Sequence, residues 1–322
     1  MCSGNVRPYN PAIHWLLFIL VLLFCGLVMA ALAVWVMARL ILKPPRMTDA
    51  KAVWLLKRLS PGDLGLPFTP LSFRVRDGQN GRPLNLAAWW IGSRQDSDRC
   101  AILLHGYADA KVGAIAWAPL LHGLGYNVLA LDLPGHGESD YRPVSCGYWE
   151  RHLIAQVIDQ LRSDRPRQAR TIVLYGLSYG ALVAAATAAL RDDIAGVVLD
   201  SPPISAMRAA AVHYELAGLP GWPLRELAAV LAARLARADW SRMHLPSLVP
   251  QICCGLLVIE CDEDPFMLEG ERRELELAMQ RRRDSQLQSE YLFIPEARHL
   301  LGIQVEPERY AQAVGSFLPG ID

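Results

Sequence analysis

The chain lacks an excess of charge of either sign. Its 322 residues contain 32 Lys and Arg and 32 Asp and Glu, so the formal net charge is zero. Without a strongly basic balance or a long basic tract, nucleic-acid binding is not predicted. The short run 281–283 of three arginines lies in a charged, helix-like stretch and is interpreted as a solvated helix face. The 52% of hydrophobic residues suffice for a sizeable core, which suits one large domain or one domain plus an appendage.

The chain also lacks the patterns of metal and nucleotide sites. Its seven cysteines form no C-x-x-C pair, and no His/Cys spacing typical of a metal site occurs. A phosphate loop and a dinucleotide fingerprint are both missing, so the sequence predicts no cofactor. An odd number of cysteines favours free thiols and therefore a reducing compartment.

Charged side chains are missing from residues 15–38. At 1.5 Å per residue this stretch spans about 36 Å as a helix, which exceeds a hydrocarbon core of about 30 Å. A secretory signal peptide has a shorter apolar region, of about 7–15 residues. Trp15 and Trp35 lie near the two ends, where indole rings favour the membrane interface. We therefore expect residues 1–43 to hold a tail and one transmembrane helix, followed by a linker at 44–65.

The residues that flank the apolar stretch predict its orientation. Arg7 is the one charged side chain before it, whereas several basic side chains follow. These are Arg39, Lys43, Arg46, Lys51, Lys57 and Arg58. Because basic flanks tend to stay in the cytoplasm, we expect a single-pass membrane protein whose C-terminal part is cytoplasmic.

Apolar runs and turn signals behind the linker predict a mostly parallel sheet. Residues 71–76 and 84–91, joined by the turn-forming residues 77–81, read as an antiparallel hairpin. Short apolar runs then alternate with helix-like segments, at 101–104, 128–131, 172–174, 197–199, 256–259 and 291–294. This alternation is typical of an α/β fold with helices on both faces of the sheet. Ligands of such folds lie beyond the carboxyl ends of the strands.

A serine, a cluster of acids and a histidine follow three of these strands. Ser178 is the centre of the sequence 176–180, which fits the G-x-S-x-G turn. Asp264 closes the triplet 262–264, and His299 follows the last strand. A serine hydroxyl needs a base within hydrogen-bond reach, and that base needs a carboxylate to orient it. The order Ser178, Asp264, His299 is the one expected of α/β-hydrolases.

Five segments in order carry the resemblance to that superfamily: LLHGYADAK, LALDLPGHGESD, YGLSYGAL, VIECDEDPF and ARHLL. From about residue 66 to 319 the chain resembles α/β-hydrolases, most closely their membrane-anchored and cytosolic esterase-like members. The resemblance implies an α/β-hydrolase domain at 66–322 with a short lid-like insertion at about 201–250. It also implies an oxyanion hole formed by the backbone N–H groups of Tyr107 and Tyr179.

The sequence offers one main candidate for the catalytic base and several for the acid that orients it. His299 is the one histidine of eight that follows the last strand, while His105 and His136 lie in glycine-flanked turns that suggest structural roles. Asp264 is the acid that the resemblance implies, and Asp262 is the alternative. Remoter candidates for the acid are Glu263, Glu260 and Asp200. Cys261 replaces the glycine usual before this loop, which bears on the loop's geometry.

Together these features predict a membrane-anchored serine hydrolase that cleaves carboxylic esters through an acyl-enzyme. The anchor at residues 15–38 favours lipid-like substrates. Aromatic residues of the insertion suit either an acyl pocket or the core. Two alternatives stay open: a serine peptidase or amidase of the same fold, and a catalytically silent scaffold that binds a partner. The intact serine, aspartate and histidine argue against the scaffold.

Overall fold

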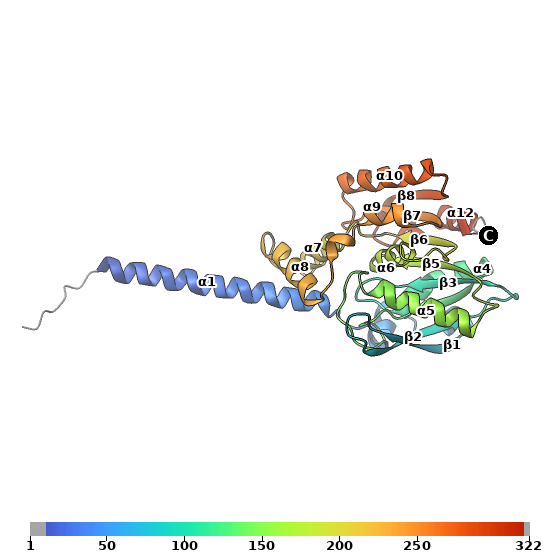
Figure 1. Cartoon of the computed structure of the whole chain (residues 1–322), viewed down its shortest axis with the longest axis horizontal. Helices are drawn as coiled ribbons and strands as arrows, with labels where there is room; N and C mark the ends of the chain where they lie inside the picture. The colour runs from blue at the N-terminus through green and yellow to red at the C-terminus, as the bar shows by residue number, and fades with distance from the viewer. Residues whose placement is uncertain (1–10, 319–322) are drawn as a thin grey trace, which may run out of the picture.

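A computed structural model describes residues 11–318, and Figure 1 shows a long helix projecting from a layered body. The predicted tail at residues 1–10 and the last four residues of the predicted hydrolase domain lie outside the described residues. The C-terminal end of the described chain lies on the side of the body opposite to the projecting helix.

One sheet of eight strands forms the centre of the body, in the order β1-β2-β4-β3-β5-β6-β7-β8. The strands are β1 Thr69–Arg76, β2 Pro83–Ile91, β3 Arg99–Leu104, β4 Asn127–Leu131, β5 Thr171–Leu177, β6 Gly196–Asp200, β7 Gly255–Glu263 and β8 Ser289–Arg298. β2 is antiparallel to both β1 and β4, and the pairs from β4 to β8 are parallel. This arrangement confirms the predicted α/β fold with an antiparallel hairpin at its start.

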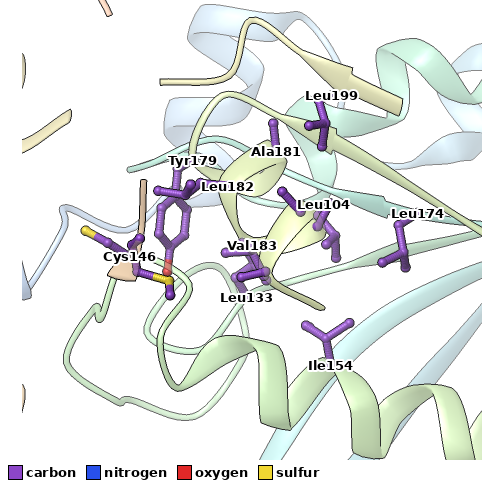
Figure 2. Close-up of a cluster of buried hydrophobic side chains, with 14 of the residues drawn as sticks. Leu104, Leu133, Cys146, Ile154, Leu174, Tyr179, Ala181, Leu182, Val183 and Leu199 are labelled. Atoms are coloured by element: carbon purple, nitrogen blue, oxygen red, sulfur yellow. The ribbon is translucent and has the colours of Figure 1, made fainter. Parts of the chain in front are cut away.

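Both faces of the sheet are buried at its central strands. Successive residues of these strands point to opposite faces, and almost all of them are buried. On β3, Ile102 and Leu104 belong to one core cluster, whereas Ala101 and Leu103 belong to the other. The first face is covered by helices α5 Glu150–Asp164 and α6 Tyr179–Ala188, and the second by α4 Ala118–Gly123 and α12 Pro307–Phe317. Figure 2 shows part of the first cluster, where side chains of α6 meet those of neighbouring strands. Parallel strands buried on both faces explain the near-continuous apolar runs of the sequence.

The remaining helical segments lie between the strands and around the ends of the sheet. They are α2 Asp49–Leu56, η1 Pro61–Leu64, α3 Lys111–Ala114, η2 Ile115–Trp117, α10 Glu269–Asp284 and α11 Gly302–Val305. The segment 44–65, expected as a linker, therefore contains two short helices. Ala52 of α2 is buried against Ala110 and Val112, so this segment packs on the body.

The long helix α1, Pro11–Leu42, is the one helix in the described part of the chain that is long and apolar enough to cross a membrane. Its mean hydropathy reaches 3.0, and none of that most apolar stretch is buried. Its last turns are different, because Met37, Ala38, Ile41 and Leu42 are buried in the main core. The helix thus projects from the body but ends inside it (Figure 1).

The predicted insertion at 201–250 is helical. It contains α7 Ala206–Leu216, α8 Leu224–Leu235, η3 Trp240–Arg242, α9 Leu245–Leu248 and η4 Val249–Gln251. Helices α7 and α8 form a hairpin, which we call the cap, and it lies beside the end of α1 (Figure 1). The buried residues of α8 are alanines, namely Ala228, Ala229 and Ala232.

Candidate active site

Ser178 occupies a sharp turn between strand β5 and helix α6. Its backbone has φ 52° and ψ −117°, a conformation that is costly for a residue with a side chain. Tight packing requires glycine on both sides of it. A Cβ atom at residue 176 would lie 2.3 Å from the Gly180 carbonyl oxygen, and one at residue 180 would lie 2.3 Å from the Leu104 carbonyl oxygen. The turn therefore holds Ser178 at the carboxyl edge of the sheet for steric reasons.

The structure brings Ser178, His299 and Asp264 together in one hydrogen-bonded chain. His299 Nε2 lies 2.8 Å from Ser178 Oγ, and His299 Nδ1 lies 2.7 Å from Asp264 Oδ2. The Asp264 carboxylate is almost fully buried, and its other oxygen accepts the Phe266 N–H at 2.9 Å. A buried carboxylate fixed in this way holds the imidazole with its Nδ1 proton toward the acid and leaves Nε2 free to accept a proton from the serine.

The predicted oxyanion residues lie next to this chain. Tyr179 is the first residue of α6, so its backbone N–H has no acceptor in a preceding helical turn. The backbone at Gly106 passes close to the serine, because a Cβ atom at residue 106 would lie 3.6 Å from Ser178 Cβ. Tyr107 follows directly, and its ring packs at 6.4 Å from that of Tyr179. The two residues therefore border the same side of Ser178.

The alternative acids are engaged elsewhere. The exposed Asp262 carboxylate lies 3.7 Å from Arg272, and Glu263 lies 3.6 Å from Arg298. Glu260 is buried and binds Arg272 and the Tyr291 hydroxyl. Strand pairing between β7 and β8 shifts its register between Cys261 and Glu263. Cys261, which replaces the glycine usual before this loop, thus lies at a register shift of β7, three residues before Asp264.

Asp200 does not reach His299 directly but belongs to a buried network behind it. Its carboxylate accepts the Tyr310 hydroxyl at 2.6 Å and the Ser201 hydroxyl at 3.0 Å. Ser201 Oγ in turn accepts the N–H of Leu300, the residue after His299, at 3.1 Å. Burial raises the pKa of Asp200 to about 6. The network ties the histidine loop to the end of β6, and the sequence reasoning missed this role of Ser201.

His105 and His136 have structural positions, as their glycine-flanked turns suggested. His105 Nδ1 donates to the Gly106 carbonyl at 2.7 Å, and its Nε2 accepts the Leu133 N–H at 2.9 Å. The imidazole thus joins the loops after β3 and β4 as a neutral ring. Burial lowers the pKa of His105 to about 4 and that of His136 to about 3.

Ser178 opens into a narrow, mainly apolar pocket. Its wall contains Phe266 beside His299, Ile41 from α1, three residues of the cap and five others: Ala209, Ala210 and His213 of the cap, and Tyr107, Val144, Cys146, Tyr179 and Pro203. The end of α1 is therefore part of the pocket, and the Tyr107 hydroxyl donates to the Ile41 carbonyl at 3.0 Å. Sequence reasoning missed this, because nothing in residues 39–43 indicates a contact with a serine far along the chain.

No group of three or more His, Cys, Asp or Glu side chains within residues 11–318 could hold a metal ion. The cysteines among these residues are free thiols. The protein groups that the structure brings together at the site are a serine and a base oriented by an acid, with the first backbone N–H of α6 beside them.

Comparison with known families agrees with this geometry. Residues 101–313 match the model of the alpha/beta hydrolase family. The chain belongs to this family. Among solved structures, an esterase of Pyrococcus furiosus superposes on this α/β-hydrolase with a TM-score of 0.66 and 26% identity, over 87% of this chain and 98% of that one.

Curated relatives match a shorter part of this α/β-hydrolase. An epoxide hydrolase B of Mycobacterium tuberculosis is 34% identical over 126 residues, which are 39% of this chain and 33% of the relative. An esterase of the same species is 33% identical over 119 residues, 36% of this chain and 38% of the relative. At most about half the length of the first relatives is matched. These similarities support a hydrolase of the esterase type.

Proposed function

We propose that this α/β-hydrolase is a membrane-anchored serine hydrolase that cleaves carboxylic esters through an acyl-enzyme. The observation that carries the proposal is the hydrogen-bonded chain from Ser178 through His299 to the buried Asp264, at 2.8 and 2.7 Å. These distances are within the range in which a base can take a proton from a serine. The apolar pocket beside Ser178 suits an acyl chain better than a charged peptide.

In the first half of the reaction Ser178 Oγ attacks the ester carbonyl carbon while its proton moves to His299 Nε2. The negative charge that develops on the carbonyl oxygen is stabilised by the N–H groups of Tyr107 and Tyr179. The Asp264 carboxylate stabilises the imidazolium that forms. When the tetrahedral intermediate collapses, His299 returns the proton to the alcohol, which leaves as the acyl group stays on Ser178.

In the second half a water molecule replaces the alcohol. His299 Nε2 takes a proton from the water, whose oxygen attacks the acyl carbon, and the same N–H groups again stabilise the oxyanion. The bond to Ser178 Oγ then breaks, the serine regains its proton from His299, and the carboxylic acid is released.

For the anchor, the proposal is that α1 spans a membrane and leaves the hydrolase body in the cytoplasm. The exposed apolar surface of α1 supports the anchor, and the basic residues after it support the orientation. Arg46, four residues after the end of α1, is held on the body, where its guanidinium donates to the Gly137 and Ser139 carbonyls at 2.9 Å. Arg39 and Lys43 at the end of α1 are exposed and remain the relevant charges.

The test is hydrolysis of matched p-nitrophenyl esters and p-nitroanilides by the wild type and by Ser178→Ala, with folding of both checked by thermal melting. We expect ester hydrolysis by the wild type and a loss of at least about 10⁴-fold in kcat for Ser178→Ala. Preferential cleavage of the anilides would favour the peptidase or amidase alternative. Absence of any hydrolysis by folded wild-type protein would favour the silent scaffold.

A further inference from the structure

Helix α1 has one side that packs against the body, and this side extends into its uncharged part. The residues that are buried or half-buried recur at helical spacing: Ala30, Ala33, Val34, Met37, Ala38, Ile41 and Leu42. The main partner of α1 is helix α8 of the cap, with α7 as a second partner. Alanines on both sides allow close approach of the two helices, as in helix pairs inside membranes.

The length of α1 places this contact at the level of the membrane. The uncharged stretch 15–38 contains Ala30, Ala33 and Val34, which face the cap. The part of α1 before Ala30, residues 11–29, contains no Lys, Arg, Asp or Glu and spans about 28 Å, so a hydrocarbon core of about 30 Å that begins at Pro11 ends at about Ala30, where the half-buried residues begin. A membrane-spanning α1 therefore carries the cap into the membrane surface.

The cap tip, which we define as residues 215–227 between and around the ends of α7 and α8, has the composition of a membrane-contacting surface. Leu216 is 69% exposed, Trp222 81% and Leu227 53%. The cap tip has three charged residues. Arg225 and Glu215 form an ion pair at 2.9 Å, and Glu226 is exposed. In Figure 1 the cap projects from the body along α1, toward the N-terminal end of that helix.

A second cavity lies between the end of α1 and α7, on the side of the cap. It is lined by Leu40, Ile41, Lys43, Pro45, Tyr107, Ala108, His213, Tyr214, Ala217 and Leu219. Ile41, Tyr107 and His213 also line the pocket of Ser178, so the two hollows share a wall. This cavity reaches from the cap tip, at Ala217 and Leu219, toward the reactive serine.

We propose that the cap tip inserts into the same membrane leaflet as the end of α1, and that esters of long-chain acids pass from the bilayer into the Ser178 pocket between α1 and α7. The substrate class rests on the proposed serine hydrolase function, whereas the membrane contact of the cap tip rests on the proposed membrane span of α1 and not on the chemistry of Ser178. Continuity with α1 is what selects a lipid bilayer as the occupant of this apolar surface. Leu216, Trp222 and Leu227 would otherwise face water directly beside a membrane helix.

The membrane contact is tested with Trp222 as a spectroscopic probe. The full chain is reconstituted into phosphatidylcholine vesicles with plain or brominated acyl chains, and tryptophan quenching is compared between the wild type and Trp222→Phe. With Trp15 and Trp35 near the ends of the span, we expect Trp222→Phe to remove about a third of the lipid-quenchable emission, because all three indoles meet the bilayer. Equal quenching in both proteins would overturn the insertion of the cap tip, and would leave a protein partner as the occupant.

The path for the substrate is tested by comparing two esters. The double variant Leu216→Gln/Leu227→Gln is assayed on a long-chain ester held in vesicles and on water-soluble p-nitrophenyl acetate. We expect the vesicle rate to fall about tenfold or more, since burying even one leucine is worth about that factor, with less than a twofold change on the soluble ester. The matched control is Leu190→Gln/Leu277→Gln, which changes leucines 45% and 60% exposed on other parts of the body.

The outcomes separate the two proposals. Equal loss on both esters, or equal loss in the control variant, would contradict delivery from the bilayer. Failure of the wild type on both esters would contradict the serine hydrolase function, while the quenching result would still decide whether the cap tip enters the membrane.

Discussion

Replacing Asp264 by asparagine is the substitution that distinguishes most sharply between the acids of this loop. Asp264 Oδ1 accepts the Phe266 N–H at 2.9 Å, so an asparagine keeps its oxygen there and turns its NH₂ group toward His299. An NH₂ group at that position, 2.7 Å from Nδ1, can only donate. The imidazole must then carry its proton on Nε2, facing Ser178, and can no longer accept the serine proton.

The expected loss is large because the tautomer, rather than a distance, is changed. The same change in a serine protease triad lowers kcat about 10⁴-fold. We therefore expect a fall in kcat of about 10³- to 10⁴-fold for Asp264→Asn, which is about 4–5.5 kcal/mol at 1.36 kcal/mol per tenfold, with a small change in KM.

The matched control is Asp262→Asn, two residues away. Asp262 is 47% exposed at its side chain and meets only Arg272, at 3.7 Å, so less than a twofold effect is expected. Both variants are assayed with p-nitrophenyl butyrate as full chains in detergent, with melting temperatures as a check on folding. The reasoning is refuted if Asp264→Asn keeps more than a tenth of kcat, or if Asp262→Asn causes the larger loss.

Three further predictions concern packing, pH and the loop beside the serine. Gly180→Ala should destabilise the fold by about 1–3 kcal/mol in urea unfolding, because its Cβ would lie 2.3 Å from the Leu104 carbonyl oxygen, whereas Gly123→Ala, with open space around it, should not. Burial lowers the pKa of His136 to about 3. Below pH 6.5 this histidine is therefore protonated in the unfolded state but stays neutral in the folded state. Stability should therefore fall by about 1.4 kcal/mol per pH unit from this group between pH 6 and 4, and His136→Phe should flatten the acid side of the curve. Tyr107→Phe removes a hydrogen bond from the loop beside Ser178 to the Ile41 carbonyl of α1, so the free energy of unfolding in urea should fall by about 0.5–1.5 kcal/mol, and an unchanged value would contradict this contact.

The order of the central elements could be read from the sequence because the central strands β3, β4, β5 and β6 are buried almost throughout. Residues at 101–104 and 172–174, for example, are buried on both faces of a parallel sheet, which produces an apolar run with no polar alternation. The sharp turn at Ser178 could also be anticipated, since only glycine fits at residues 176 and 180. Local patterns of this kind reflect local steric and burial requirements.

The contact between α1 and the pocket could not be predicted from local patterns. Tyr107 and Ile41 are 66 residues apart in the sequence, and the hydrogen bond that joins them uses a backbone carbonyl, which every residue has. An apolar Ile41 at the end of an apolar helix also gives no sign that it faces a pocket rather than lipid.

The acid of the site could be predicted only in part from the sequence. Asp262 lies near the end of β7 and Asp264 directly follows it, and between them the pairing of β7 with β8 is irregular. A side chain beyond such an irregularity cannot be assigned to one side of the sheet by counting alternate residues. The resemblance to a family favoured Asp264, and the structure has this residue within hydrogen-bond distance of His299.

The central claim is that Ser178 is the nucleophile, and labelling with a fluorophosphonate followed by peptide mapping tests it most directly. The account predicts a single covalent adduct on Ser178 of the wild type, and no adduct on folded Ser178→Ala. Folded wild-type protein that takes up no label, or an adduct that persists on another residue after the substitution, would contradict it.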